Sequence, residues 1–267
     1  MRATPPAAGG SRLGPTVVAL ARRALVNALR KPQFLAPLVI FPTLFLAINV
    51  GGLGATRTLE GFPQVDGFLD YQLAAAILQS LLIGGVTAGI AVALDIEGGF
   101  FDRLVASPAP RIAIVLGRVL AAGVIAAAQV VYFLVLGLAF GASVKGGAIG
   151  VLCVLTIGIV AGTGFGALGV LIALRARSAS TVQGIFPLVF VVLFISSAFF
   201  PLELLSAPAD VIATYNPLSF IATGMRQPIA FSNQWLPVLE GLAAAVALTA
   251  VSIGLSLLAL RGRLRDA

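Results

Sequence analysis

The chain has 267 residues, of which 59% are hydrophobic and only 10% are charged, and its mean hydropathy is +1.07. Soluble domains carry roughly 25% charged residues, so this composition excludes that class and indicates an integral membrane protein. Histidine is absent and Cys153 is the single cysteine. A histidine-based metal site or proton relay and an internal disulfide are therefore excluded, and we expect Cys153 to be a small packing residue.

Two segments precede the first long apolar run. Residues 1–14 are rich in Ala, Gly, Pro and Arg, and we expect a disordered cytoplasmic tail. Residues 15–33 predict an amphipathic helix that lies on the membrane surface, because apolar and basic side chains occupy opposite halves at helical spacing. The basic half includes Arg22, Arg23, Arg30 and Lys31. Anchoring on anionic lipid is the simpler role of this helix, and docking of a cytoplasmic partner is the addition.

The rest of the chain predicts an all-α integral membrane domain over residues 34–260, with a cytoplasmic tail at 261–267. A helix needs about 20 mostly apolar residues to cross a bilayer. By that measure we expect six transmembrane helices, near residues 34–53, 72–94, 112–140, 148–174, 183–204 and 236–260. Asp70 and Asp95 are expected to bracket the second span.

The distribution of basic residues predicts the orientation. With the N-terminus inside, only Arg57, Lys145 and Arg226 of the 17 basic residues fall outside. An excess of Lys and Arg marks cytoplasmic loops, so both termini are expected in the cytoplasm. The same distribution accounts for the net charge of +7 without nucleic acid as a partner.

The most polar stretch between two long apolar runs is residues 95–118. Gly98 and Gly99 provide flexibility, and about two helical turns are expected after them. Pro108 and Pro110 then end the helix, because proline lacks the amide donor and clashes with the preceding turn.

The side chains of these turns divide into two sides at helical spacing. Phe100, Phe101 and Leu104 fall on one side, with Asp102 and Arg103 on the other. The pattern predicts a short amphipathic peg between two spans. A connecting loop with a solvated charged face is the plainer alternative.

Residues 200–235 are too apolar for a simple loop and are interrupted by too many prolines for a span. We expect two short helices that re-enter the outer leaflet, since non-helical backbone at that depth must be buried in protein or face a cavity. Asn216 would cap the second helix and Pro217 would take its first position.

Further polar and small residues lie within the apolar runs. Gly158, Gly162 and Gly166 recur every four residues, which predicts close approach of another helix, from this chain or from a second copy. Glu240 is the one acid placed within a run, in the first turns of the last helix, where the helix dipole and the interface favour a carboxylate. The uncharged polar residues are expected to make interhelical hydrogen bonds, and a few could line a route for a solute: Gln72, Gln79, Ser80, Thr87, Gln129, Tyr132, Thr156, Thr163, Ser196 and Ser197.

The sequence resembles the membrane subunits of type-2 ABC (ATP-binding cassette) exporters, especially the daunorubicin-resistance-type permeases of bacteria. One motif follows the second span: Glu97, Gly98, Phe101, Asp102, Arg103, Leu104, Ser107, Pro108, Arg111, Gly117 and Arg118. The other is Asn216-Pro217-Leu218 with Arg226 after it. The pair Phe100-Phe101 is bulkier than the family pattern, which would reflect a different groove on the partner.

The resemblance implies that the peg is a coupling helix seated in a groove of a separate cytoplasmic ATPase. Its contacts would come from Glu97, Gly98, Phe100, Phe101, Asp102, Arg103, Leu104, Ser107 and Pro108, with Arg22, Arg23 and Arg30 as a second contact. The chain has no phosphate-binding loop of its own, so ATP and magnesium would sit on the partner, and no cofactor or metal is expected here.

The implied assembly is two permeases, identical or sister chains, with two ATPase subunits in the bacterial inner membrane, surrounded by lipid. It would export a drug, antibiotic, lipid or glycolipid. The alternative is a self-contained secondary carrier or channel, which would need buried ionisable residues or an inverted repeat.

Overall fold

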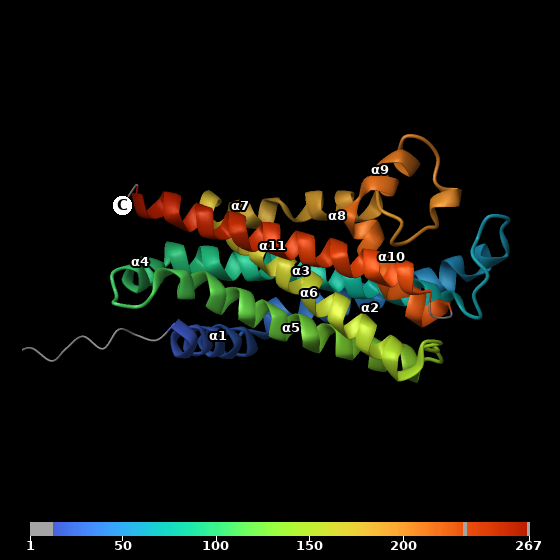
Figure 1. Ribbon diagram of the computed structural model, residues 1–267, viewed down its shortest axis with the longest axis horizontal. Coiled ribbons are helices and arrows are strands. Elements are labelled where there is room, and N and C mark those ends of the chain that lie inside the picture. The colour runs from blue at the N-terminus through green and yellow to red at the C-terminus, as the bar shows by residue number, and fades with distance from the viewer. Residues whose placement is uncertain (1–12, 232–233, 266–267) are drawn as a thin grey trace, which may run out of the picture.

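The computed structural model describes residues 13–231 and 234–265, and all regular structure within these ranges is helical. Residues 1–12 of the predicted disordered tail lie outside the described residues. Residues 13 and 14, which we expected in the tail, belong to α1 (Leu13–Leu29), a helix that begins two residues before and ends four residues before the amphipathic helix expected at 15–33. α1 packs beside α5 at one end of a long bundle (Figure 1).

Five of the described helices are long and apolar enough to cross a membrane. They are α2 (Pro32–Leu53), α3 (Phe68–Glu97), α5 (Arg111–Ala139), α6 (Gly147–Ala176) and α11 (Trp235–Arg265). They run along the long axis of the molecule (Figure 1). α3 extends two residues beyond Asp70 and two beyond Asp95, so both residues lie within the helix, close to its ends. α11 likewise extends through residues that we expected in a C-terminal tail.

The expected fifth span at 183–204 is not one helix. α7 (Ala179–Gly184) and α8 (Phe186–Phe194) follow one another along the outside of the bundle (Figure 1). Pro187 stands in the first turn of α8, so it fits a helix start and not a helix interior. A non-helical stretch then leads to η2 (Leu202–Leu204). The longest apolar helical run here is Ala179–Phe194, so five spans are confirmed by length and the sixth is not.

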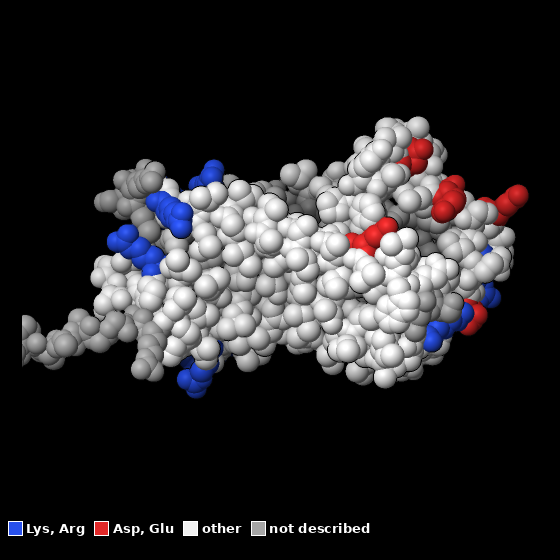
Figure 2. Space-filling model, in the orientation of Figure 1, with Lys and Arg blue, Asp and Glu red and all other residues white. Residues whose placement is uncertain are grey.

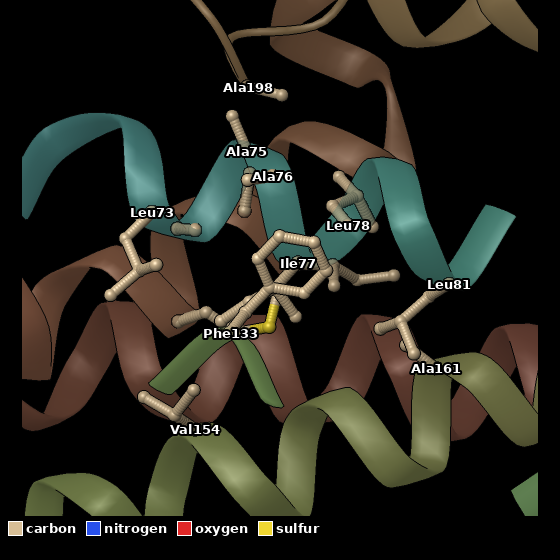
Figure 3. Close-up of a cluster of buried hydrophobic side chains, with 14 of the residues drawn as sticks. Leu73, Ala75, Ala76, Ile77, Leu78, Leu81, Phe133, Val154, Ala161 and Ala198 are labelled. Carbon is tan, nitrogen blue, oxygen red and sulfur yellow. The ribbon is translucent and has the colours of Figure 1, made fainter. Parts of the chain in front are cut away.

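α3 is the central helix of the bundle, and its residues 71–83 are all buried. Figure 3 shows Leu73, Ile77 and Leu81 of this helix packed with Phe133 of α5 and with α6. Alternation of alanine with larger apolar side chains lets the neighbouring helices approach α3 closely from several sides.

Glycines bring α6 into backbone contact with its neighbours. A methyl group on Gly158 would lie 2.6 Å from Val130 Cγ2, and methyls on Gly162 and Gly166 would be closer still to α5. The predicted close approach is therefore confirmed, and the partner helix belongs to the same chain. On another face of α6, a methyl on Gly85 of α3 would lie 2.6 Å from the carbonyl oxygen of Phe165.

The far end of the bundle is covered by η1 (Gly54–Thr58), α9 (Ala209–Tyr215) and α10 (Pro217–Ala230) (Figure 1). Two helices, α9 and α10, thus lie within residues 200–235, where a re-entrant pair was expected. Asn216 caps α10 as predicted, because its side-chain oxygen accepts the amide of Leu218 at 2.9 Å and Pro217 takes the first helical position.

Candidate functional site

A six-residue helix, α4 (Phe100–Val105), stands where the sequence predicted the peg. It lies at the end of the bundle that also holds the described C-terminal end of α11 (Figure 1). Gly99 precedes it with φ = +66°, a conformation that glycine adopts without strain, and this allows the sharp turn out of α3. After α4 the backbone stays non-helical through Pro108 and Pro110, and α5 begins at Arg111.

The predicted two-sidedness of α4 is confirmed, and its apolar side faces this chain. Phe101 is only 4% exposed and packs with Val92, Ile96 and other buried residues, and Leu104 is half-buried against the same cluster. Asp102 and Arg103 are exposed. The expectation that Phe101 reaches into a partner is not met in this structure, where Phe101 anchors the helix to the bundle and the outward surface is polar.

A cluster of charges connects α1 to the segment around α4. Asp95, near the end of α3, pairs with Arg118 of α5. Arg23 of α1 places its Nη1 3.4 Å from Asp95 Oδ2, and its guanidinium lies 3.4 Å above the ring of Phe100. Partial burial lowers the pKa of Arg23 from its ordinary value. Arg23 therefore attaches α1 to the end of α3 by an ion pair and to the first residue of α4 by a cation–π contact.

Two further contacts tie the same segment to α7 and α11. Glu97 Oε1 accepts the amide of Ala179 at 2.8 Å, so the last residue of α3 caps the start of α7. Arg263 of α11 places Nη2 3.3 Å from Asp102 Oδ1, and its guanidinium lies 4.5 Å above the ring of Phe101. α4 and its flanks are thus attached to α1, α5, α7 and α11, and a displacement of α4 would act on all four helices.

The remaining residues of the predicted contact set lie around this helix or along α1. Ser107 donates its hydroxyl to the carbonyl of Leu104 at 2.7 Å and so closes the end of α4. Gly98 and Pro108 are exposed beside it. Arg22 of α1 and Arg30, which directly follows α1, are exposed, whereas Arg23 is directed inward.

A second cluster of polar side chains donates hydrogen bonds to carbonyl groups at and after the end of α8, which would otherwise lack donors. Arg226 of α10, only 4% exposed, donates to the carbonyls of Ser197, Ala198 and Tyr71 and stacks 3.8 Å above the Tyr71 ring. The side chain of Asn216 donates to the carbonyl of Val192 at 3.0 Å.

Gln72 of α3 completes this cluster by donating to the carbonyl of Phe199 at 3.2 Å. Asn216 and Arg226, which the sequence singled out, therefore act together with Gln72, which it treated as one of several polar residues. Their shared role follows from the interruption of the helix at residues 195–201, because backbone in an apolar environment must find partners within the protein.

A cavity of about 100 Å³ lies between α1, α2, α3 and α5, close to the end that carries α4. Most of its wall is apolar, with Thr87 and Gln129 deeper in the bundle and Asn27, Lys31, Asp95 and Arg118 at the charged end. An apolar wall with a few polar groups at one end is the arrangement that amphipathic molecules require.

Charge is distributed unequally between the two ends of the molecule. On the face shown in Figure 2, the end that holds α4 carries Lys and Arg without acidic residues, whereas the opposite end carries the acidic residues together with other Lys and Arg side chains. The middle of the bundle carries no charge on this face, which is the pattern of a protein that crosses an apolar layer.

Comparison with known proteins agrees with this geometry. A family model described as "ABC-2 type transporter" matches residues 15–229, from α1 through α10. The chain belongs to the ABC-2 type transporter family. This ABC transporter permease is also 30% identical over 217 residues to the daunorubicin resistance ABC transporter permease protein DrrB1 of Streptomyces coeruleorubidus, covering 77% of this chain and 71% of that protein. The predicted resemblance to type-2 ABC permeases is thereby confirmed.

Proposed function

We propose that this chain is the membrane-spanning subunit of an ATP-driven exporter, and that separate ATPase subunits bind it at α4. The observation that carries the proposal is the attachment of this short helix and the adjoining end of α3 to α1, α5, α7 and α11 through Arg23, Asp95, Glu97 and Arg263. An effector biases a two-state protein only through contacts that differ between the states, and α4 is the element through which such contacts would reach the bundle.

The docking surface would be the polar outer side of α4 and the residues next to it. Asp102 and Arg103 are exposed, and Glu97, Gly98 and Pro108 are exposed beside them. Phe101 and Leu104 would hold the helix rigid against the bundle, so that a push on α4 moves the spans and not the helix alone. Arg22 on α1 and Arg30 directly after it would add a second contact.

The assembly would contain two ATPase chains, which bind ATP and magnesium, and two permeases, identical or sister chains, in the bacterial inner membrane. α7, α8 and the capped stretch after them would supply the sixth crossing, which brings both termini to the cytoplasmic side together with α4. The gathering of basic residues at that end supports this orientation (Figure 2).

The exported molecule would be amphipathic or hydrophobic, such as a drug, antibiotic, lipid or glycolipid. The cavity beside α1 supports this class, because its wall is apolar and its charged end lies where the inner leaflet would meet the cytoplasm. The printed name of the DrrB1 relative makes daunorubicin a suitable first probe.

The test is ATP-dependent uptake of daunorubicin into inside-out vesicles that contain this chain and its cognate cassette ATPase. We expect uptake with ATP and none with a non-hydrolysable analogue. Arg103→Glu should leave insertion intact and reduce both uptake and ATPase binding, whereas Arg57→Glu, an exposed arginine of η1, should change neither.

Uptake driven by a proton gradient without any ATPase would instead favour a self-contained carrier. That alternative requires buried ionisable residues that are available for transport. Among the described residues, Asp70 and Arg226 are buried, but both are engaged by backbone groups: Asp70 accepts the amide of Ser143, and Arg226 donates to three carbonyls.

A further inference from the structure

Gln79 is a buried amide that its surroundings do not satisfy. It lies in the middle of α3 with no exposed surface, and neither its side-chain nitrogen nor its oxygen has a hydrogen-bond partner. Leaving such a group unpaired away from water costs free energy, and in an apolar layer the cost is greater. A leucine or methionine at this position would avoid the cost. We therefore expect the glutamine amide to find a hydrogen-bond partner in a second arrangement of the helices.

A water molecule does not resolve the deficit. The side chain faces a narrow crevice between α2, α3 and the stretch that follows α8, and the crevice has no volume that a water could enter. A buried water needs at least about 10–15 Å³. The amide must therefore find its partner when the crevice widens.

The walls of the crevice indicate what that partner is. Gln72 lies seven residues before Gln79, about 10 Å along the same face of α3, and Asn49 faces them from α2. Phe45 and Phe199 supply aromatic surface beside the amides, with ring centroids 5.1 Å apart. None of the described residues that line the crevice is charged. Amide groups between aromatic rings suit the uncharged oxygens of a carbonyl or hydroxyl compound with a flat apolar body.

The two other walls lack the close glycine-mediated backbone contacts that join α3 to α6. α2 contains Pro37 and Pro42, which remove backbone hydrogen bonds within the helix, and its outer face is exposed. The opposite wall is Phe199, in the non-helical stretch that side chains hold in place. Separation of these walls would open the crevice without disrupting the glycine contacts that join α3 to α6.

We propose that Gln79 is a substrate-binding residue. When α2 and the Phe199 stretch separate from α3, its amide exchanges hydrogen bonds with an uncharged carbonyl or hydroxyl group of the exported amphipathic molecule. The proposal rests on the exporter function above and adds a contact residue and a chemical class to it. Gln72 would change its partner from the Phe199 carbonyl to the same molecule.

The test compares Gln79→Met with Gln227→Met in the full complex with its ATPase. Methionine has the shape of glutamine without its polar atoms. Gln227 is a matched control, because its amide oxygen is also buried and unpaired but lies on α10, outside the crevice. Daunorubicin binding is measured by fluorescence quenching, uptake is measured in vesicles, and thermal stability is measured in detergent.

We expect Gln79→Met to be at least as stable as the wild type, because a buried unpaired amide is removed, and yet to bind daunorubicin about tenfold more weakly. Gln227→Met should bind daunorubicin as the wild type does. A stable Gln79→Met with wild-type binding and uptake would overturn the proposal and leave the exporter function standing. Absence of ATP-dependent uptake by the wild-type complex would count against the exporter function itself.

Discussion

Replacing Asp95 by asparagine removes the carboxylate that lies between Arg118 and Arg23 and leaves two cations beside each other. Exposed ion pairs contribute about 0–1 kcal/mol, and removal of one member of a fully buried pair costs about 3–5 kcal/mol. The side chains of Asp95 and Arg118 are 20% and 17% exposed, and that of Arg23 is 36% exposed and hence more strongly screened by water. The site lies between the two limits, so we expect a loss of about 2 kcal/mol.

Thermal unfolding of the purified chain in detergent measures this loss directly. For a protein of this size, about 2 kcal/mol corresponds to a fall in Tm of about 4–8 °C. Asp102→Asn is the matched control, because Asp102 also pairs with an arginine but its side chain is 67% exposed, and we expect less than about 1 kcal/mol there. Adding Arg118→Gln to Asp95→Asn should recover part of the stability, since one unpaired cation is removed.

The functional consequence follows from the same contacts. Asp95→Asn should reduce ATP-dependent uptake more than it reduces ATPase binding, because it loosens α1 and α5 from the root of α4 and leaves the outer surface of α4 unchanged. If Asp95→Asn and Asp102→Asn lowered Tm equally, the inference that Asp95 joins these helices would be wrong.

Three further changes test other parts of the structure by thermal unfolding. Arg226→Leu should cost at least about 3 kcal/mol, because three buried carbonyls lose their donor, whereas Arg57→Leu should stay within about 1 kcal/mol; equal losses would contradict the capping role. Gly166→Ala should destabilise by about 1–3 kcal/mol through its clash with α5, whereas Gly254→Ala, with open space around it, should be neutral or stabilising; the same sign at both sites would contradict the packing. Phe101→Ala should cost about 3–5 kcal/mol in the isolated chain, and an unchanged Tm would show that Phe101 is not an anchor.

Features that depend on local spacing could be predicted from the sequence. The proline and glycine positions located α4 and the start of α10, and the four-residue glycine repeat predicted the close helix contact. The choice of neighbour could not be predicted in this way. Nothing in the glycine repeat says that α5 of the same chain is the partner, because that depends on Val130, Ala126 and Ala122, which lie 28 to 44 positions away.

The expected fifth span shows where apolar composition is insufficient. The apolar run is long enough to cross a membrane, but Gly184, Pro187 and the two serines at 196 and 197 favour breaks in the helix. The polar residues that donate to the carbonyls of this stretch come from α3 and from α10 with its cap. Likewise, hydrophobic periodicity correctly gave the two sides of α4, but whether the apolar side faces a partner or the chain's own core is decided by tertiary packing.

The location of α4 relative to the membrane tests the central claim most directly, and the single cysteine makes the measurement simple. Cys153→Ala gives a cysteine-free background, into which Ala106→Cys, beside α4, and Ser206→Cys, between η2 and α9, are introduced separately. A membrane-impermeant maleimide applied to intact cells should label Ser206→Cys and not Ala106→Cys, and in inside-out vesicles bound ATPase should protect Ala106→Cys from the reagent. Labelling of Ala106→Cys in intact cells would contradict the account.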